Sequence, residues 1–139
     1  MANKDAAFGL KPVRTLGGVA NFTTNEYDIA SNHTNAIFQG SPVIATAAGG
    51  IDVAGNTSDK IVGVFQGCSY TDPVSGEFRQ QNQYPASTAA DDIIAYVASD
   101  PFLVMQMQSD ESLDQDDLGK NVGVIQTAGS TVFGISKNA

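Results

Sequence analysis

The feature that most constrains the fold is a series of short apolar segments, each ended within a few residues by glycine, proline or polar residues. The strongest segment is Ile-Val-Gly-Val-Phe at 61–65, whose β-branched side chains would face both surfaces of a sheet. This pattern indicates a central strand. Many short strands, glycine-rich turns and almost no helix favour an all-β fold, built as a small barrel or sandwich.

Further strands are predicted where short apolar segments recur along the chain. In the segment 103–108, the alternate residues Leu103, Met105 and Met107 share one face, which indicates a half-buried strand. The predicted strands are 27–30, 36–39, 42–46, 51–53, 61–65, 93–97, 103–108, 122–125 and 131–135, with hairpin turns at 49–50 and 128–130 and a long polar excursion over 68–92.

At most one short helix is expected, over residues 112–119. Ser112 is its predicted N-cap, and Gln115, three residues later, completes a capping box. Gly119 can adopt the left-handed conformation that ends many helices. Neither an internal repeat nor a second domain is visible, so residues 27–139 are predicted to form a single β-rich domain.

Residues 1–26 are predicted to form an extended N-terminal arm. Its glycines and proline interrupt isolated apolar residues at a spacing that makes neither a clear helix nor a clear strand. A polar linker would not carry so many large apolar side chains, so we expect them to dock on the chain's own body or on a neighbouring subunit. The candidate contact residues are Phe8, Leu10, Pro12, Val13, Leu16 and Phe22.

The composition narrows the classes of partner. Charged residues make up 16% of the 139 residues, below the usual share of about 25%, so much of the surface must be polar or buried against partners. The net charge is −8, and the seven Lys and Arg are scattered, which argues against nucleic-acid binding. No apolar run is long enough for a membrane helix or a signal peptide, so no membrane partner is expected.

Two residues are candidates for nucleophilic chemistry. His33, the only histidine, stands in a polar turn and is interpreted as an ordinary surface residue rather than a member of a catalytic triad. Cys68 is interpreted as a buried structural thiol, because a reactive thiol needs a base and His33 is the only imidazole. Phosphate loops, dinucleotide fingerprints, zinc spacings and nucleophile elbows are all missing from the sequence. We therefore predict no enzyme, no catalytic residue and no cofactor.

The acidic stretch 110–117 is the best candidate for a metal site. Its alternating acids begin a calcium-loop pattern that Leu118 breaks, so solvated acids are favoured and no metal is predicted. Tyr70, Phe78 and Tyr84 in the polar excursion could form a sugar-binding face, but an apolar patch that holds the loop on the body is favoured. A carbohydrate- or calcium-binding module is therefore the least favoured alternative.

Several stretches together resemble the capsid decoration (cement or head-stabilising) proteins of tailed bacteriophages. The likeness covers most of the chain and carries no catalytic signature. Residues 36–67 are also similar to the β-tulip decoration proteins of lambda-like phages. The stretches that carry the first resemblance are 1–14, 27–31, 37–43, 61–70, 93–101 and 118–121.

The resemblance implies a structural virion protein, made in the host cytoplasm, that binds the outer surface of the expanded capsid. Its implied partners are the major capsid protein and two further copies of itself, in a homotrimer at three-fold or quasi-three-fold lattice sites. Its arm would add to the capsid protein or lie along it. Proteins of this family often continue past the final hairpin and carry an acid where Ser41 stands here. The alternative is another virion β-domain, associated with the tail, the head–tail junction or a fibre.

Overall fold

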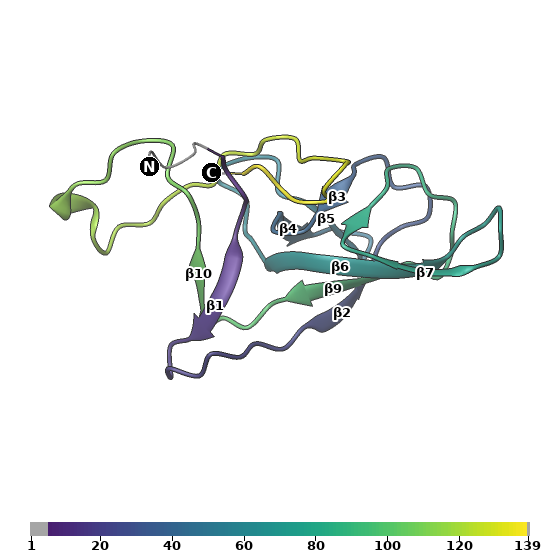
Figure 1. Ribbon diagram of the computed structural model, residues 1–139, viewed down its shortest axis with the longest axis horizontal. Coiled ribbons are helices and arrows are strands. Elements are labelled where there is room, and N and C mark those ends of the chain that lie inside the picture. The colour runs from purple at the N-terminus through teal and green to yellow at the C-terminus, as the bar shows by residue number, and fades with distance from the viewer. Residues whose placement is uncertain (1–5, 139) are drawn as a thin grey trace.

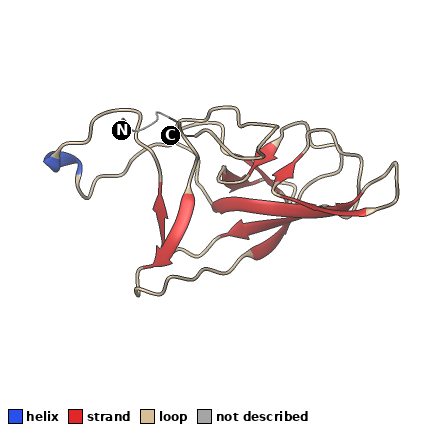
Figure 2. Cartoon of the chain, in the orientation of Figure 1, coloured by secondary structure: helices blue, strands red, loops and turns tan. Residues whose placement is uncertain are grey.

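The computed structural model describes residues 6–138, and within them the protein is all-β, as expected (Figures 1 and 2). Residues 1–5 of the predicted arm and residue 139 lie outside the described residues. Every pair of neighbouring strands is antiparallel, and the sheets do not close into a barrel. The elements are β1 Lys11–Thr15, β2 Asn25–Asp28, β3 Ile37–Phe38, β4 Pro42–Ala45, β5 Ile51–Val53, β6 Gly63–Thr71, β7 Phe78–Gln81, β8 Gln83–Tyr84, β9 Ile94–Ala98, β10 Leu103–Gln106 and the 3-10 turn η1 Gln115–Asp117.

The largest sheet is built around β6. Its strand order is β2-β9-β6-β4-β5, and β7 also pairs with β6. The segment 61–65 is therefore central, as predicted, although the strand begins at Gly63 and continues to Thr71. The hairpin between β4 and β5 turns at Gly49-Gly50, which confirms the turn expected there.

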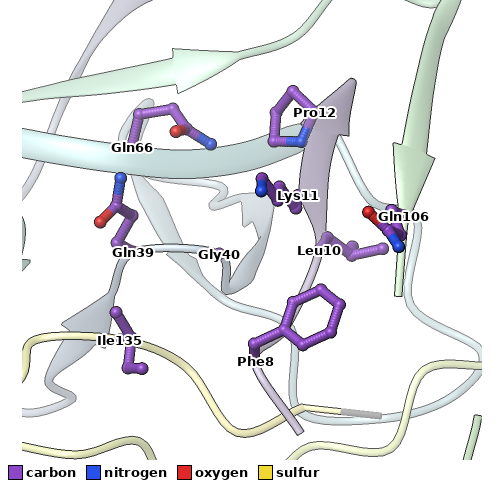
Figure 3. A pocket seen from close by; sticks show the side chains of 9 residues that line it. All are labelled: Phe8, Leu10, Lys11, Pro12, Gln39, Gly40, Gln66, Gln106 and Ile135. Atoms are coloured by element: carbon purple, nitrogen blue, oxygen red, sulfur yellow. The ribbon is translucent and has the colours of Figure 1, made fainter. Parts of the chain in front are cut away.

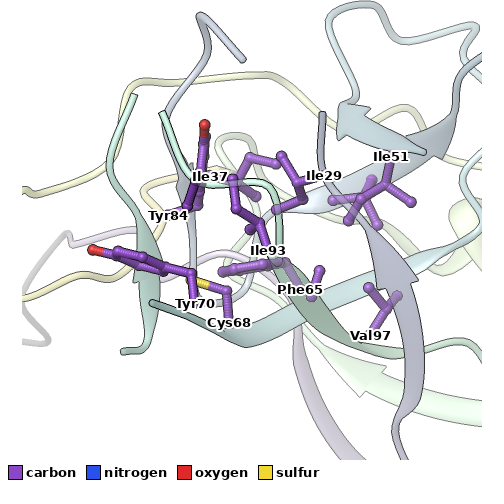
Figure 4. Close-up of a cluster of buried hydrophobic side chains, with 12 residues drawn as sticks. Ile29, Ile37, Ile51, Phe65, Cys68, Tyr70, Tyr84, Ile93 and Val97 are labelled. Carbon is purple, nitrogen blue, oxygen red and sulfur yellow. The ribbon is translucent and has the colours of Figure 1, made fainter. Parts of the chain in front are cut away.

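The core lies along β6 and extends to the small sheet β3-β8 (Figure 4). Phe65 and Cys68 of β6 are fully buried, together with Tyr84 of β8 and Ile37 of β3. Burial of each large apolar side chain contributes about 1.5–3 kcal/mol to folding. The apolar segments of the sequence thus form one cluster, which also contains Ile29, Val43, Ile51, Tyr70, Ala90, Ile93, Ala95 and Val97.

β1 and β10 form a two-stranded ribbon, separate from the main sheet. The ribbon projects from the main sheet, and β1 lies between β10 and β6 (Figures 1 and 3). The strand β1 was not predicted, because the arm's spacing indicates no regular element. It forms by pairing with β10, from Lys11 opposite Gln106 to Thr15 opposite Leu103, with a bulge between Pro12 and Arg14.

The beginning of the described chain is held by its own end. The Gly9 amide donates to the Asn138 carbonyl at 3.1 Å, and the Leu10 amide donates to the Gly40 carbonyl at 2.9 Å. Gly9 has a φ of +76°, and a Cβ there would lie 2.6 Å from the Gly40 oxygen and 2.7 Å from Cβ of Ser136. Glycine is required at this junction because both the conformation and the space exclude a side chain.

Two predicted C-terminal strands, 122–125 and 131–135, are wrong. These segments run as loops and turns, and the region is connected by isolated bridges from Ile135 to Ser130 and to Gln39. Gln39 donates its amide to the Gly134 carbonyl at 3.0 Å and accepts the Ser136 amide at 2.8 Å. These hydrogen bonds hold the C-terminal segment beside the end of β3, but the segment forms no full strand in a described sheet.

The expectations for 112–119 and 68–92 also need correction. The helix is only the 3-10 turn η1, and its N-cap is Asp114, which shares a capping box with Asp117. An isolated helix of this length gains too little from packing or hydrogen bonding to extend. The polar excursion is not irregular, because it contains the end of β6 and the strands β7 and β8. No helix within residues 6–138 has the length and hydropathy needed to cross a membrane.

Candidate interaction surface

The predicted arm residues are placed in two different environments. Phe8, Leu10 and Pro12 line a cavity of about 500 Å³ at the root of the ribbon (Figure 3). Val13 and Leu16 are exposed instead, and Phe22 is partly buried. The arm contacts the chain's own body at residues 8–12 and presents apolar side chains to solvent further along. The other residues lining the cavity are Lys11, Gln39, Gly40, Gln66, Gln106 and Ile135.

Three glutamine side chains from different parts of the fold line this cavity. Gln66 comes from β6, Gln106 from β10, and Gln39 directly follows β3. Among the described residues, the buried Nε2 of Gln66 has no hydrogen-bond partner. Ser41 is also buried, and its hydroxyl has no hydrogen-bond partner among the described residues.

Three exposed apolar residues, Leu16, Val19 and Phe102, lie near the end of the ribbon where β1 ends and β10 begins, and we call them the ribbon end. These three side chains are 66%, 60% and 63% exposed. They are held together by backbone hydrogen bonds, from the Leu16 amide to the Phe102 carbonyl at 2.8 Å and from the Thr15 amide to the Val19 carbonyl at 2.9 Å. Exposed apolar residues that gather in this way mark interaction surfaces in soluble proteins.

The loop 107–126, at the base of the ribbon, is the second exposed apolar region. It projects from the body beyond β10 (Figure 1). Leu113, Leu118 and Val122 on this loop are all exposed. In the sequence, Leu113 and Leu118 stand on either side of a group of acids. One of these acids, Asp117, accepts a hydrogen bond from the Lys120 ammonium group at 3.1 Å. The loop therefore combines apolar and acidic side chains on one projecting segment.

His33 is partly buried and has a structural role in this fold. Its Nε2 lies 2.8 Å from Oδ1 of Asp52, and its carbonyl accepts the Tyr84 hydroxyl at 3.3 Å. The interpretation as an ordinary surface residue underestimated these contacts, because the partners lie far away in sequence. The histidine joins the loop after β2 to β5 and β8.

Cys68 is buried, as the sequence interpretation held. Its thiol donates to the Gln83 carbonyl at 3.3 Å, and desolvation raises its pKa to about 12. At neutral pH the group is therefore a protonated thiol, which is a poor nucleophile. The thiol packs within the core cluster beside Tyr70 and Tyr84 (Figure 4).

The residues that pointed to metal or sugar binding do not converge. Tyr70 and Tyr84 are core residues, and Phe78 is exposed on β7, so the three aromatics form no common face. Within residues 6–138, no group of three or more His, Cys, Asp or Glu side chains is arranged to hold a metal ion. The reading of these aromatics as an apolar patch that fastens the loop therefore holds for both tyrosines.

The apolar ribbon end is the feature that sequence reasoning located only in part. Leu16 was among the expected contact residues, whereas Val19 and Phe102 were not, because only the pairing of β1 with β10 brings position 102 to the arm.

Comparison of this chain with protein-family models, with curated proteins and with solved structures found no match.

Proposed function

We propose that this chain is a non-enzymatic structural protein of a bacteriophage virion, which binds the outer surface of the expanded capsid and stabilises the major capsid protein lattice. The observation that carries the proposal is the exposed apolar surface of the ribbon end and the loop 107–126. It is supported by the resemblance of most of the sequence to capsid decoration proteins. Such a role requires surfaces that bury apolar side chains between neighbours, and it requires no reaction chemistry.

The size of the ribbon end indicates how such a protein would bind. Complete burial of Leu16, Val19 and Phe102 would contribute about 3–6 kcal/mol, given that about two thirds of each side chain is exposed. Association alone costs about 4–15 kcal/mol in lost translational and rotational freedom. One ribbon end is therefore too small to hold one chain on a surface.

A trimer would overcome this limit, and we include it in the proposal. Three linked copies bind with a high effective concentration after the first contact, so three weak contacts act together. The apolar residues of the loop 107–126 would add further buried area in each copy. A ligand that binds only the expanded shell then stabilises that state by mass action.

Co-sedimentation with expanded, undecorated capsids tests the proposal, with unexpanded shells as the control. We expect saturable binding to expanded shells only, with a copy number approaching that of the capsid subunits. The variant Leu16→Asp should fold and lose most of this binding. The matched variant Val74→Asp changes a side chain that is 95% exposed in the β6–β7 turn, and it should bind like the wild type.

The outcomes separate this role from other positions in the virion. Absence of binding to expanded shells would overturn the proposal and favour a domain of the tail, the head–tail junction or a fibre. Equal binding to expanded and unexpanded shells would contradict the stabilisation of one state. Equal loss of binding in Leu16→Asp and Val74→Asp would exclude the ribbon end as the specific contact.

A further inference from the structure

The outer edge of β10 has no strand partner among the described residues. β10 pairs with β1 along one edge, in a sheet of two strands. Because β1 lies between β10 and β6, the other edge of β10 faces away from the body (Figures 1 and 3). Within residues 6–138, its one backbone hydrogen bond outside that pairing runs from the Leu103 amide to the Asp100 carbonyl, at 3.2 Å. The open edge therefore presents unpaired backbone donors and acceptors.

The edge strands of the main sheet carry features that prevent pairing between molecules. Glu26 and Asp28 stand on β2, and Arg79 stands on β7. β5 is three residues long and contains Asp52. Charges and short length are the usual means by which natural edge strands avoid pairing with other chains. The small sheet is protected by length alone, since β3 and β8 have two residues each.

β10 lacks every one of these features. Its sequence is Leu-Val-Met-Gln, with no charge, no proline and no bulge. The ribbon's protective residues, Lys11, Pro12 and Arg14, and its bulge all belong to β1, which faces the body. Among the described strands longer than three residues that stand at a sheet edge, β10 is thus the one with an unprotected edge.

The charges carried by the edge strands indicate which of them could pair with a second copy of the chain. Two copies of a chain with a net charge of −8 repel each other, so a self-pairing edge must not place like charges opposite one another. Self-pairing of β2 would bring acids against acids, and self-pairing of β7 would bring Arg79 near its counterpart. Self-pairing of β10 brings only neutral side chains together.

We propose that two copies of this chain pair through the open edges of β10, antiparallel and about a two-fold axis. The strand order of the joined sheet would be β1-β10-β10-β1. A sheet of four strands would give the ribbon the stability that a two-stranded ribbon lacks in water. The same surface patch serves both copies, as two-fold contacts require. This pairing does not depend on shell binding, and on a shell it would link one trimer to the next.

Sedimentation velocity of the purified chain, residues 1–139, over a wide range of concentrations tests the pairing. We expect the wild type to associate reversibly as concentration rises, by pairing of single chains or of preformed trimers. The variant Gln106→Glu puts a carboxylate on β10 opposite Lys11, which favours the ribbon, but it also places a charge on the open edge of each copy, which opposes pairing. We expect it to weaken the dimer by at least about ten-fold. The matched variant Gln80→Glu, on the edge strand β7, should dimerise like the wild type.

Amide hydrogen exchange in the wild type locates the contact independently of any variant. Exchange at 103–106 should slow as concentration rises, while exchange at 78–81 stays constant. A wild type whose mass does not change with concentration would overturn the proposal. So would a dimer without added protection at 103–106, or equal dimerisation of Gln106→Glu and the wild type. Each of these results leaves the shell-binding test unaffected, so the two proposals fail separately.

Discussion

Nε2 of His33 lies 2.8 Å from Oδ1 of Asp52, and this contact joins the loop after β2 to the edge strand β5. Asp52 also accepts hydrogen bonds from the side-chain amide of Asn35 and from the Val53 backbone amide. The only histidine of the chain is thus held by residues that the fold brings together. The pair therefore fastens the polar loop after β2 to the main sheet.

Replacement of Asp52 should therefore destabilise the protein. We expect Asp52→Ala to lower the free energy of unfolding by about 1–3 kcal/mol, because it leaves the partly buried donors of His33 and Val53 without their acceptor. Urea unfolding of the variant and the wild type measures the difference. Asp91→Ala is the control, since Asp91 is exposed and its loss should change stability by less than about 0.5 kcal/mol. Equal effects in both variants would contradict the role of the His33–Asp52 contact.

The contact between Asp92 and Thr71 should make stability depend on pH. The Thr71 hydroxyl, at 2.6 Å, and its backbone amide hold the pKa of Asp92 below the ordinary value of 3.8. Because the pKa of Asp92 is lower in the folded protein than in the unfolded chain, the contact stabilises the fold fully at pH values above the unfolded pKa. The stabilisation is lost as pH falls through the folded pKa. Urea unfolding at about pH 7 and about pH 3 should show Thr71→Val less stable than the wild type, with a smaller difference at the lower pH. A difference that grows on acidification would contradict this assignment.

Cys68 should react slowly with alkylating reagents in the native protein. Burial raises its pKa from 9.0 to about 12, so neither the thiolate nor access is available near neutral pH. We expect alkylation at least about a thousand-fold slower than in urea, because reaction must wait for unfolding. The variant Ala47→Cys supplies an internal control, since position 47 is exposed and its thiol should react at once. Mass spectrometry that finds both thiols modified at similar rates would refute the prediction.

Substitutions at Gly9 and Gly18 separate the energetic cost of a left-handed backbone conformation from the cost of steric crowding. Both have positive φ, but a Cβ at Gly18 would meet nothing within 4 Å, whereas one at Gly9 would meet Gly40 and Ser136. Gly18→Ala should cost about 1–2 kcal/mol for the left-handed conformation alone. Gly9→Ala should cost at least about 1 kcal/mol more, because it also overpacks the junction. Denaturant unfolding measures the loss of stability in both variants. Equal losses would contradict the prediction, because the junction at Gly9 would then accommodate a Cβ without steric cost.

The sequence predicts best the parts of this fold that depend on local pattern and burial. The apolar segments that became β4, β5, β9 and β10 were located within a few residues, and β6 was recognised as central. The strands β4, β5, β6 and β9 contain buried residues, so their apolar composition indicates their position, whereas β10 is only partly buried. The buried Cys68 was recognised for the same reason.

The errors arose where tertiary pairing decides the structure. β7 is polar and mostly exposed, and it is a strand only because β6 provides its hydrogen-bond partners. The segment 131–135 has the composition of a strand, but Val132 and Phe133 are exposed and no described strand pairs with them in a full ladder. Of the interaction surface, only Leu16 could be anticipated, since Phe102 reaches it through the β1–β10 pairing.

The hydrogen bond between Gly9 and Asn138 couples the fraying of the two ends of the described chain. Release of residues 8–10 would remove a partner from Asn138, whose buried side chain also fastens Gln126 and Thr127. Loosening of the C-terminal segment would in turn free Gly9. Proteolytic cleavage at residues 8–10 and cleavage at residues 126–138 would therefore meet a single shared barrier, because one opening of this junction exposes both segments.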